Sequence, residues 1–494
     1  MPKGAWIPQI RASEYKAGEV FVVVNNYRLF DYKPYLFRSR DFGQTWESIA
    51  TAAEFGDNNY ILAVQQDPVE PKLIFVGAEN GLFVSLDEGK TYTRWTSGLP
   101  AGVPVMDLVI HPREHDLVIC TFGRALFVLD DIRPLREMVK TGPTVLNNGL
   151  YVFDAPNAYQ VTFQDPTGIL FPGNSMFEGE NRPSGAMISY VINKPEKKEE
   201  PKKEENKADD KSKKGAADKN KVTSSPKVEE SKDDKKDEKA QKADSLTMEV
   251  FNAKNEKIRT VKQKVSDDNG FSRIYWAMNE KGERSPSRGA RRRGGDEPAG
   301  PQVLPGTYKV RITYDGKKDS TMVVVKSDPR YPNMDNVLQA RYALLKDLQK
   351  MAGLASQASE RLKESLEIAD DYEKRIKESK RTDLKDATDK TKAIKDSINA
   401  VIDFMIGKED KRQGLAASPI PTPVSYIFTA QNYIASSKDP VNATDERVMK
   451  QASDQIDRIL DRVNKFYEKQ WPQYRAAMEK VSINPFKSYE PLKR

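Results

Sequence analysis

Two short segments of the chain combine hydroxyl, carboxylate and glycine residues at the same spacing. Both fit the pattern S-x-D-x-G-x-T-[WY], which fixes Ser39, Asp41, Gly43, Thr45 and Trp46 in the first copy and Ser85, Asp87, Gly89, Thr91 and Tyr92 in the second. Ser and Asp side chains can bond to turn backbone groups that lack partners, and Gly supplies φ > 0 at low steric cost. The pattern therefore predicts turns closed by side-chain hydrogen bonds. We interpret both copies as structural, not as a pair of catalytic carboxylates.

A second group that could do chemistry is Arg124 with Asp130 and Asp131, which flank an apolar segment. These three are candidate ligand-facing residues, and no catalytic set can be assigned around them. With one cysteine and only two histidines, the chain can form no intrachain disulfide and no zinc site of the usual kind. We predict no metal and no cofactor. Cys120 lies in an apolar run and is expected to be a buried core residue.

Four arginines, Arg288, Arg291, Arg292 and Arg293, lie in a polar loop at 282–301. Such a cluster could bind phosphates or an acidic glycan. However, no aromatic residue lies among them and two acidic residues follow closely, which favours a flexible loop. The 80 basic and 73 acidic residues nearly balance, with a net charge of +7. Both observations argue against a nucleic-acid partner.

The segments that carry the two motifs belong to a longer repeat. Leu36–Asp41, Leu82–Asp87 and Leu126–Asp131 superpose at offsets of 46 and 44 residues, and each follows an apolar strand-like run. That period is typical of one four-stranded propeller blade. The third copy continues as Ile132-Arg133-Pro134 and lacks the Ser and Gly, so its turn should differ.

This combination resembles the Asp-box, or BNR repeat, of sialidases and of sortilin/Vps10-type propellers. The stretch from His111 to Ile132 also resembles the final blade of large bacterial proteins labelled "glycosyl hydrolase, BNR repeat" or sortilin/Vps10-like. The resemblance implies that residues 1–145 are the last blades of an Asp-box β-propeller, and that the chain is the C-terminal part of such a protein. It also implies a periplasmic or extracellular location.

Three blades do not close a propeller, which typically has four or more. We therefore expect missing upstream blades, supplied by the same or another chain. The N-terminus has no apolar core of a signal peptide, and no apolar run is long enough to span a membrane.

Residues 146–330 show short strands punctuated by turns and are expected to form an immunoglobulin-like β-sandwich. Tyr308–Tyr314 and Thr321–Lys326 should form a hairpin around Asp315-Gly316. The stretch 194–244 is almost entirely Lys, Glu, Asp, Ala, Ser and Pro, and is expected to be disordered because it has little apolar surface to bury. Because both flanks look like strands, we interpret this insert as a long hairpin loop.

From 331 to 494 the apolar period becomes helical and predicts an antiparallel bundle. The expected helices run over 336–376, 384–405, 424–436 and 444–478. Phe466, Tyr467, Trp471 and Tyr474 could form a binding face, but core packing is the favoured interpretation. Asn442-Ala443-Thr444 matches a glycosylation sequon, yet a helix cap at Thr444 explains it more simply.

Taken together, the expected class is a multidomain β plus α protein. The favoured function is that of a non-enzymatic propeller-type scaffold, which binds an extracytoplasmic protein, peptide or glycan. The alternative is a sialidase-like or xyloglucanase-like glycoside hydrolase whose catalytic residues lie largely on missing blades. That chemistry needs two carboxyl groups about 5–9.5 Å apart, and no such pair can be matched by motif.

Overall fold

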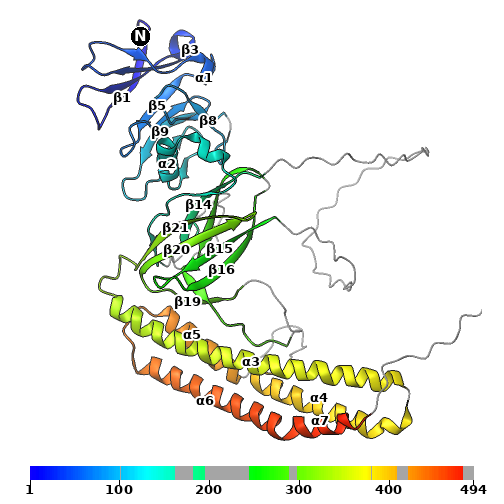
Figure 1. Ribbon diagram of the computed structural model, residues 1–494. Helices are drawn as coiled ribbons and strands as arrows, with labels where there is room; N and C mark the ends of the chain where they lie inside the picture. The colour runs from blue at the N-terminus through cyan, green and yellow to red at the C-terminus, as the bar shows by residue number, and fades with distance from the viewer. Residues whose placement is uncertain are drawn as a thin grey trace, which may run out of the picture.

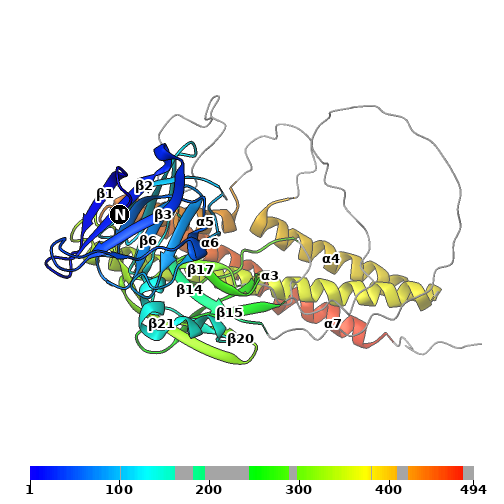
Figure 2. The same cartoon turned by 90° about the horizontal axis from the view of Figure 1, so that it is seen from above.

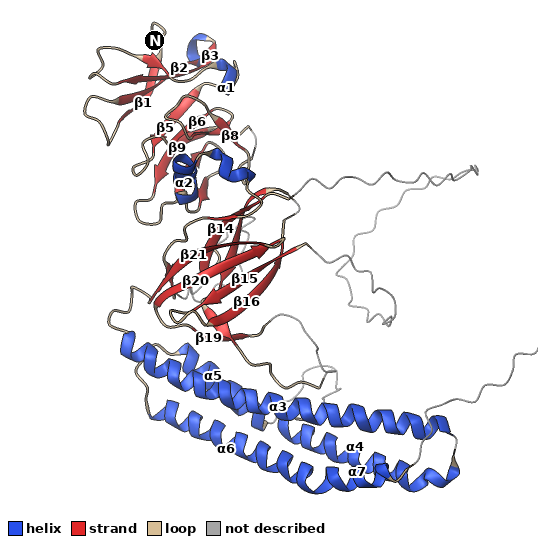
Figure 3. Cartoon of the chain, viewed as in Figure 1, coloured by secondary structure: helices blue, strands red, loops and turns tan. Residues whose placement is uncertain are grey.

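The computed structural model describes residues 1–100, 102–161, 182–194, 244–266, 268–288, 297–379, 381–408 and 421–481. Strands run as far as Lys326, and long helices follow from Asp335 onwards (Figure 3). The expected class of a β plus α fold is confirmed at this level. Figure 1 shows the N-terminal sheets at one end of the molecule, a pair of larger sheets in the middle and the helices at the other end.

The first two sheets each contain four antiparallel strands joined in sequence order. Their strands are β1 (Trp6–Ala12), β2 (Val20–Asn26), β3 (Asp31–Ser39) and β4 (Glu47–Ser48), then β5 (Ile61–Gln66), β6 (Ile74–Ala78), β7 (Gly81–Ser85) and β8 (Thr93–Trp95). Two short helices, η1 (Tyr27–Leu29) and α1 (Ala52–Phe55), complete this part. The two sequence motifs form the β3–β4 and β7–β8 turns, which are equivalent corners of the two sheets.

The third sheet has only three strands, β9 (Val105–Ile110), β10 (Leu117–Thr121) and β11 (Leu126–Leu129). Where a fourth strand would follow, the chain turns at Asp131, whose φ is 48°, and enters α2 (Arg133–Thr141). Pro134 lies in the first turn of this helix, where its missing N–H is harmless. A short helix, η2 (Pro143–Asn147), follows. The third corner therefore differs from the other two, as its sequence predicted.

The three sheets pack on one another through apolar side chains. Phe21, Val23 and Leu36 of the first sheet join Val64 and Val76 of the second in one cluster. A second cluster joins the second sheet to the third. Gly77 permits the close approach of β9, because a Cβ at this position would lie 2.6 Å from the Val105 carbonyl oxygen.

The face of the third sheet that points away from the second sheet is exposed. Val109 and Val128 are 51% and 56% exposed, and they flank Val118 in neighbouring strands. Cys120 lies in the next row, beside Leu126, and is half-buried. The expectation of a buried Cys120 is wrong, because no described residue covers this face. At the opposite end of the stack, Ile10 of β1 is likewise 63% exposed.

Two larger sheets face each other in the middle of the molecule. One has the order β12-β14-β17 and the other β13-β21-β20-β15-β16, with a small β18-β19 sheet beside them. The strand bounds are β12 (Tyr151–Val152), β13 (Ala158–Tyr159), β14 (Ala186–Ile192), β15 (Ser245–Phe251), β16 (Lys257–Lys264), β17 (Gly270–Trp276), β18 (Asn279–Lys281), β19 (Ala299–Gln302), β20 (Gly306–Tyr314) and β21 (Lys317–Lys326). One core, which includes Tyr190, Trp276 and Val310, lies between the two sheets.

The hairpin predicted in this region is confirmed. β20 and β21 pair from Gly306↔Val325 to Tyr314↔Lys317, and the turn between them is Asp315-Gly316 with φ of 44° and 73°.

The strands that flank the charged insert do not form the hairpin that we expected. β14 pairs with β12 and β17, whereas β15 pairs with β16 and β20 in the opposite sheet. The chain therefore crosses from one sheet to the other. The Lys194 ammonium and the Asp244 carboxylate, 2.9 Å apart, join the two ends of the crossover. Residues 195–243, on which the prediction of disorder falls, lie outside the described residues.

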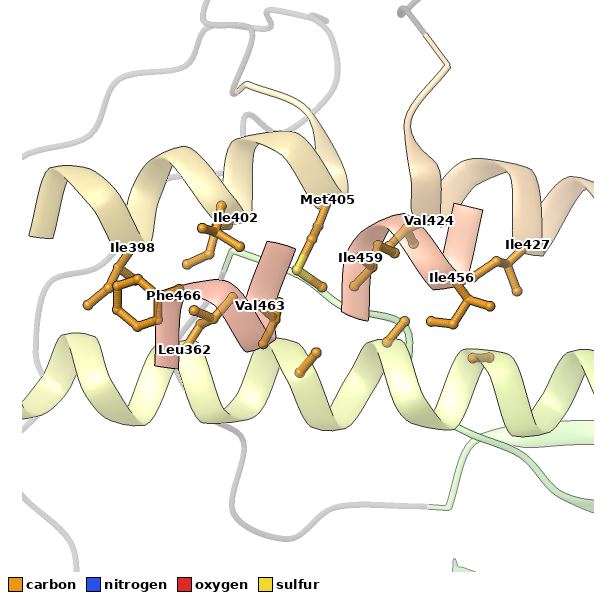
Figure 4. Packing of buried hydrophobic residues seen from close by; sticks show 14 of the residues in the cluster. Leu362, Ile398, Ile402, Met405, Val424, Ile427, Ile456, Ile459, Val463 and Phe466 are labelled. Carbon is orange, nitrogen blue, oxygen red and sulfur yellow. The ribbon is translucent and has the colours of Figure 1, made fainter. Parts of the chain in front are cut away.

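The C-terminal helices match the predicted ones closely. They are α3 (Asp335–Ser379), α4 (Lys385–Ile406), α5 (Pro423–Ser436), α6 (Ala443–Lys465) and α7 (Trp471–Glu479), with the short 3-10 helix η3 (Thr382–Leu384) and the π-helical stretch η4 (Phe466–Gln470), which connects α6 to α7. The core of the bundle is shown in Figure 4, where Leu362, Ile398 and Phe466 lie close together. No helix in the described part of the chain is long and apolar enough to cross a membrane.

Two sequence interpretations of the helical end can be compared with this packing. Phe466 and Tyr474 are buried in the bundle, and Tyr467 and Trp471 pack against the same core. Core packing, not a free binding face, thus describes these aromatics. The cap of α6 is Asn442, not Thr444 as expected, because the Asn442 side chain accepts hydrogen bonds from the backbone N–H groups of Thr444 and Asp445.

The bundle contacts the middle sheets mainly through the first part of α3. The Glu280 carboxylate accepts hydrogen bonds from the Tyr342 hydroxyl and, at 2.7 Å, from the Lys346 ammonium. Gln349 donates to the Lys281 carbonyl at 2.6 Å. Seen from above, the helices extend well beyond the sheets on one side (Figure 2).

Candidate functional site: a pocket beside the third sheet

The two motif turns share one hydrogen-bond pattern. In the first, the Ser39 hydroxyl donates to Asp41 at 2.8 Å and accepts the Gly43 N–H at 2.8 Å. The Asp41 carboxylate also accepts the N–H of Thr45 at 2.9 Å and its hydroxyl at 2.5 Å. Each polar side chain thus closes the turn by bonding to its own loop. We call this arrangement the stapled turn.

The second stapled turn repeats these hydrogen bonds. Ser85 donates to Asp87 at 2.8 Å and accepts the Gly89 N–H at 2.8 Å. Asp87 accepts the Thr91 N–H at 2.9 Å and the Thr91 hydroxyl at 2.7 Å.

The backbone conformation agrees as well. Phe42 and Gly43 have φ of 60° and 86°, and Glu88 and Gly89 have 66° and 82°. Glycine suits the second of these left-handed positions, which explains why the motif requires it there.

The aromatic residues that end the motifs have different surroundings. The Tyr92 ring packs 4.9 Å from the Phe55 ring, between the first and second sheets. Trp46, at the equivalent place in the first sheet, is 39% exposed. The first sheet has no neighbouring sheet on that side among the described residues, so Trp46 lacks the partner that Tyr92 has.

The stapled turns hold their carboxylates ionised. Hydrogen bonds from the Thr45 side chain and backbone, and then from Ser39, lower the pKa of Asp41 to about 2. Burial alone would raise the pKa of Asp87, but hydrogen bonds from Thr91, Ser85 and Lys90 outweigh it and hold this pKa below its usual value. A carboxylate with its oxygens engaged in this way suits a structural role better than proton transfer.

This depressed pKa leads to a prediction about Asp41→Ala. Because the folded-state pKa of about 2 lies below the unfolded value of about 3.9, the staple stabilises the fold above about pH 4 and loses its effect as the pH falls towards 2. The melting temperature of Asp41→Ala should lie below that of the wild type at pH 6, and the gap should close at about pH 2. Thermal unfolding across this range measures it. Asp57→Ala, a change in an exposed loop, is the control. Equal melting temperatures of Asp41→Ala and the wild type at pH 6 would show that the Asp41 hydrogen bonds do not stabilise the fold.

The structure separates the three candidate ligand-facing residues. Arg124 is exposed in the turn between β10 and β11. Asp130 and Asp131 lie at the opposite end of the four-residue strand β11, which is about 13 Å long. Arg124 therefore does not join the other two. Asp131 is buried and Asp130 half-buried, and burial followed by the nearby Asp116 carboxylate raises the pKa of Asp130.

A cavity of about 920 Å³ lies beside β11. It is enclosed by β11 of the third sheet, the β8 segment of the second sheet, α2, and β17 of the middle sheets. Its walls are mainly apolar, with contributions from Leu86, Trp95, Leu99, Phe127, Leu129 and Leu135. A concave, mostly apolar space of this size, at a junction between structural units, is typical of a ligand site.

The polar residues of the pocket form two groups: one lies at the end of β11, and the other belongs to the second sheet and the loop after it (Asp87, Thr91, Thr93, Arg94 and Ser97). Arg273 of β17 donates hydrogen bonds to the carbonyl groups of Asp130 and Asp131. Its Nε atom is buried without a hydrogen-bond partner, and so is Oδ2 of Asp131, whose other carboxylate oxygen accepts from Arg133. Both residues line the cavity. These two atoms lack partners, but both are covered by protein and neither is exposed in the cavity.

Helix α2, one wall of the pocket, is fixed by a buried ion pair. The Arg136 guanidinium bonds to both carboxylate oxygens of Asp67, at 2.8–3.0 Å, and Asp67 is completely buried. Arg136 also contacts Nδ1 of His115 at 3.0 Å. Burial, and then the positive charges of Arg136 and Arg133, lower the pKa of His115, which favours the neutral imidazole as the acceptor.

Sequence reasoning found Asp131 but missed Arg273, Arg136 and α2. The available signal for the helix was Pro134 followed by Leu135, Met138 and Val139, at the spacing of one helical face. Arg273 carried no local signal, because it approaches Asp131 from a strand 142 residues further along the chain.

The remaining candidate residues lie elsewhere. Arg288 bonds to Asp403 and to the Gly407 carbonyl of the bundle, so it takes part in an intramolecular contact. Arg291, Arg292 and Arg293 lie outside the described residues. Within the described ranges, no group of three or more His, Cys, Asp or Glu side chains is arranged to hold a metal ion.

The chain was compared with known proteins. No model of a protein family matches it, and no curated protein matches it.

Proposed function

We propose that this protein is a non-enzymatic scaffold that binds a protein or peptide in the pocket beside β11, outside the cytoplasm. The observation that carries the proposal is the pocket itself: a largely apolar cavity where the second sheet, the third sheet, α2 and β17 meet. Its apolar walls suit peptide side chains such as Leu, Val or Phe better than a glycan, whose hydroxyl groups would lose their hydrogen bonds to water there.

The proposal includes a β-propeller architecture for the three N-terminal sheets. Its support is the recurrence of the stapled turn at equivalent corners and the consecutive packing of the sheets. The exposed apolar rows at both ends of the stack are consistent with further blades, from the same or another chain. For the middle sheets, two facing sheets around one core support the immunoglobulin-like interpretation.

The carboxylates at the pocket favour binding over glycoside hydrolysis. Asp87 and Asp131 both line the cavity. Glycosidase chemistry needs one carboxyl group as a proton donor and a second that is free to act as base or nucleophile. Asp87 is engaged by Ser85 and Thr91 in the stapled turn. A pair of free carboxyl groups is thus not provided by these two residues.

We predict that Thr93→Trp blocks the pocket. Thr93 is exposed on β8 and lines the cavity, so an indole here occupies the space without disturbing a core residue, and Trp is well tolerated in strands. Random dodecapeptides displayed on phage are selected on the full chain, and enriched peptides are measured by fluorescence anisotropy. Their affinity should fall at least about tenfold in Thr93→Trp, a loss of about 1.4 kcal/mol.

Thr93→Val is the matched control, because it keeps the size of the side chain and should change affinity by less than about threefold. Glycan arrays and fluorogenic glycosides are tested in parallel. Enriched peptides that bind Thr93→Trp as well as wild type, or turnover of any glycoside, would contradict the proposal.

A further inference from the structure

We propose that the peptide binds by adding to β11 as a fourth strand of the third sheet; this inference rests on the proposed function and specifies how its ligand is held. The three N-terminal sheets differ at the position of their fourth strand. β4 and β8 occupy the fourth position in the first and second sheets, directly after the stapled turns. In the third sheet the chain leaves for α2 instead, so this position is filled by no described residue.

The outer edge of β11 has backbone groups free to pair. In an antiparallel ladder, residues alternate between those that bond to the partner strand and those that point away from it. The Thr121 N–H donates to the Ala125 carbonyl, which places the pairs Ile119↔Phe127 and Leu117↔Leu129 in the bonded class. The N–H and C=O groups of Val128 therefore point away from β10, towards the vacant fourth position.

The cavity runs along this edge. Phe127, Val128 and Leu129 all line it, although alternate side chains of a strand point to opposite faces. Thr93 and Trp95 of β8 also line it. A fourth strand beside β11 would direct every second side chain into the apolar space, and the others towards the exposed outer face of the sheet.

The ligand that fits these features is an extended peptide of about four to six residues with alternating apolar side chains. Strand addition derives affinity from main-chain hydrogen bonds and specificity from pockets for alternate side chains. A compact apolar molecule would fill the cavity but leave the β11 edge unpaired.

The test uses Val128→Pro in the full chain. Proline removes the outward N–H, and because that group makes no bond to β10, an edge strand tolerates the change. Phage-displayed dodecapeptides selected on the wild-type chain should show enriched alternation of β-branched or aromatic residues. Their affinity, measured by fluorescence anisotropy, should fall at least about tenfold in Val128→Pro.

Val128→Thr is the matched control, because it keeps the N–H and nearly the same shape, and it should retain affinity within about threefold. Circular dichroism and thermal melting verify that Val128→Pro folds. Should it fail to fold, N-methylation of single backbone amides in an enriched peptide replaces it, and a loss of affinity at every second amide is the expected result. Strand addition would be overturned, with the proposed function intact, by peptides that lose affinity in Thr93→Trp but keep it both in Val128→Pro and after N-methylation of their own backbone amides. If no peptide is enriched, both fail.

Discussion

Replacing Arg136 by Met is expected to destabilise the N-terminal sheets by about 3–5 kcal/mol, because a completely buried carboxylate then loses its ionic partner. Asp67 keeps hydrogen bonds from the backbone N–H groups of Val69 and Glu70, at 2.8 and 2.6 Å, but these do not neutralise its charge. The change also releases α2 from the loop that follows β5 and from His115, so one wall of the pocket should loosen together with the second sheet.

Urea unfolding combined with hydrogen exchange of peptides from β5, β10 and α2 measures this effect. Arg113→Met is the control, because Arg113 is largely exposed and pairs with Glu114 on the surface. Exposed pairs of this kind contribute about 0–1 kcal/mol. Similar stability of the two variants would show that the buried pair is not the anchor of α2.

The second large effect is expected in the helical bundle, for Arg341→Met. The Arg341 guanidinium bonds to the Asp439 carbonyl at 2.6 Å, the Ile434 carbonyl at 3.1 Å and the Asp445 carboxylate at 3.2 Å, all in a buried site. It ties α3 to the ends of α5 and α6. Its removal leaves a buried charge and two carbonyl groups without these partners, at a cost of about 3–5 kcal/mol.

The expected result is faster hydrogen exchange at the start of α6 and the end of α5, with exchange in the N-terminal sheets unchanged. Arg375→Met serves as control on the same helix, since its pair with Asp371 is half-exposed on both sides. A loss of protection no greater than in this control would mean that the buried cluster contributes little to the bundle.

The features that could be predicted from the sequence are those encoded by neighbouring residues. The stapled turns need only eight consecutive positions, and the hydrogen bonds of Ser39 and Asp41 stay within them. The helices were equally accessible, because the apolar period of α3 and α4 repeats over many turns. The Asp315-Gly316 hairpin was found from its turn residues for the same reason.

The features that were missed depend on contacts between distant segments. Periodicity identified β14 and β15 as strands but could not place them in opposite sheets, because pairing is decided by packing around Trp276 and its neighbours. Cys120 has an apolar sequence context, yet it lies on a sheet face that no described residue covers. The pocket required Arg273 and α2 to meet β11, and no spacing rule connects them.

The length of α3 gives the bundle the properties of a lever arm. Its 45 residues extend over about 67 Å at the usual rise per residue. Its hydrogen bonds to the middle sheets, from Tyr342, Lys346 and Gln349, lie within the first third of that length. A rotation of about 10° at this fulcrum would move the tip of α3, about 45–55 Å away, through roughly 8–10 Å. Small adjustments around Glu280 are thereby magnified into large displacements at the far end of the molecule.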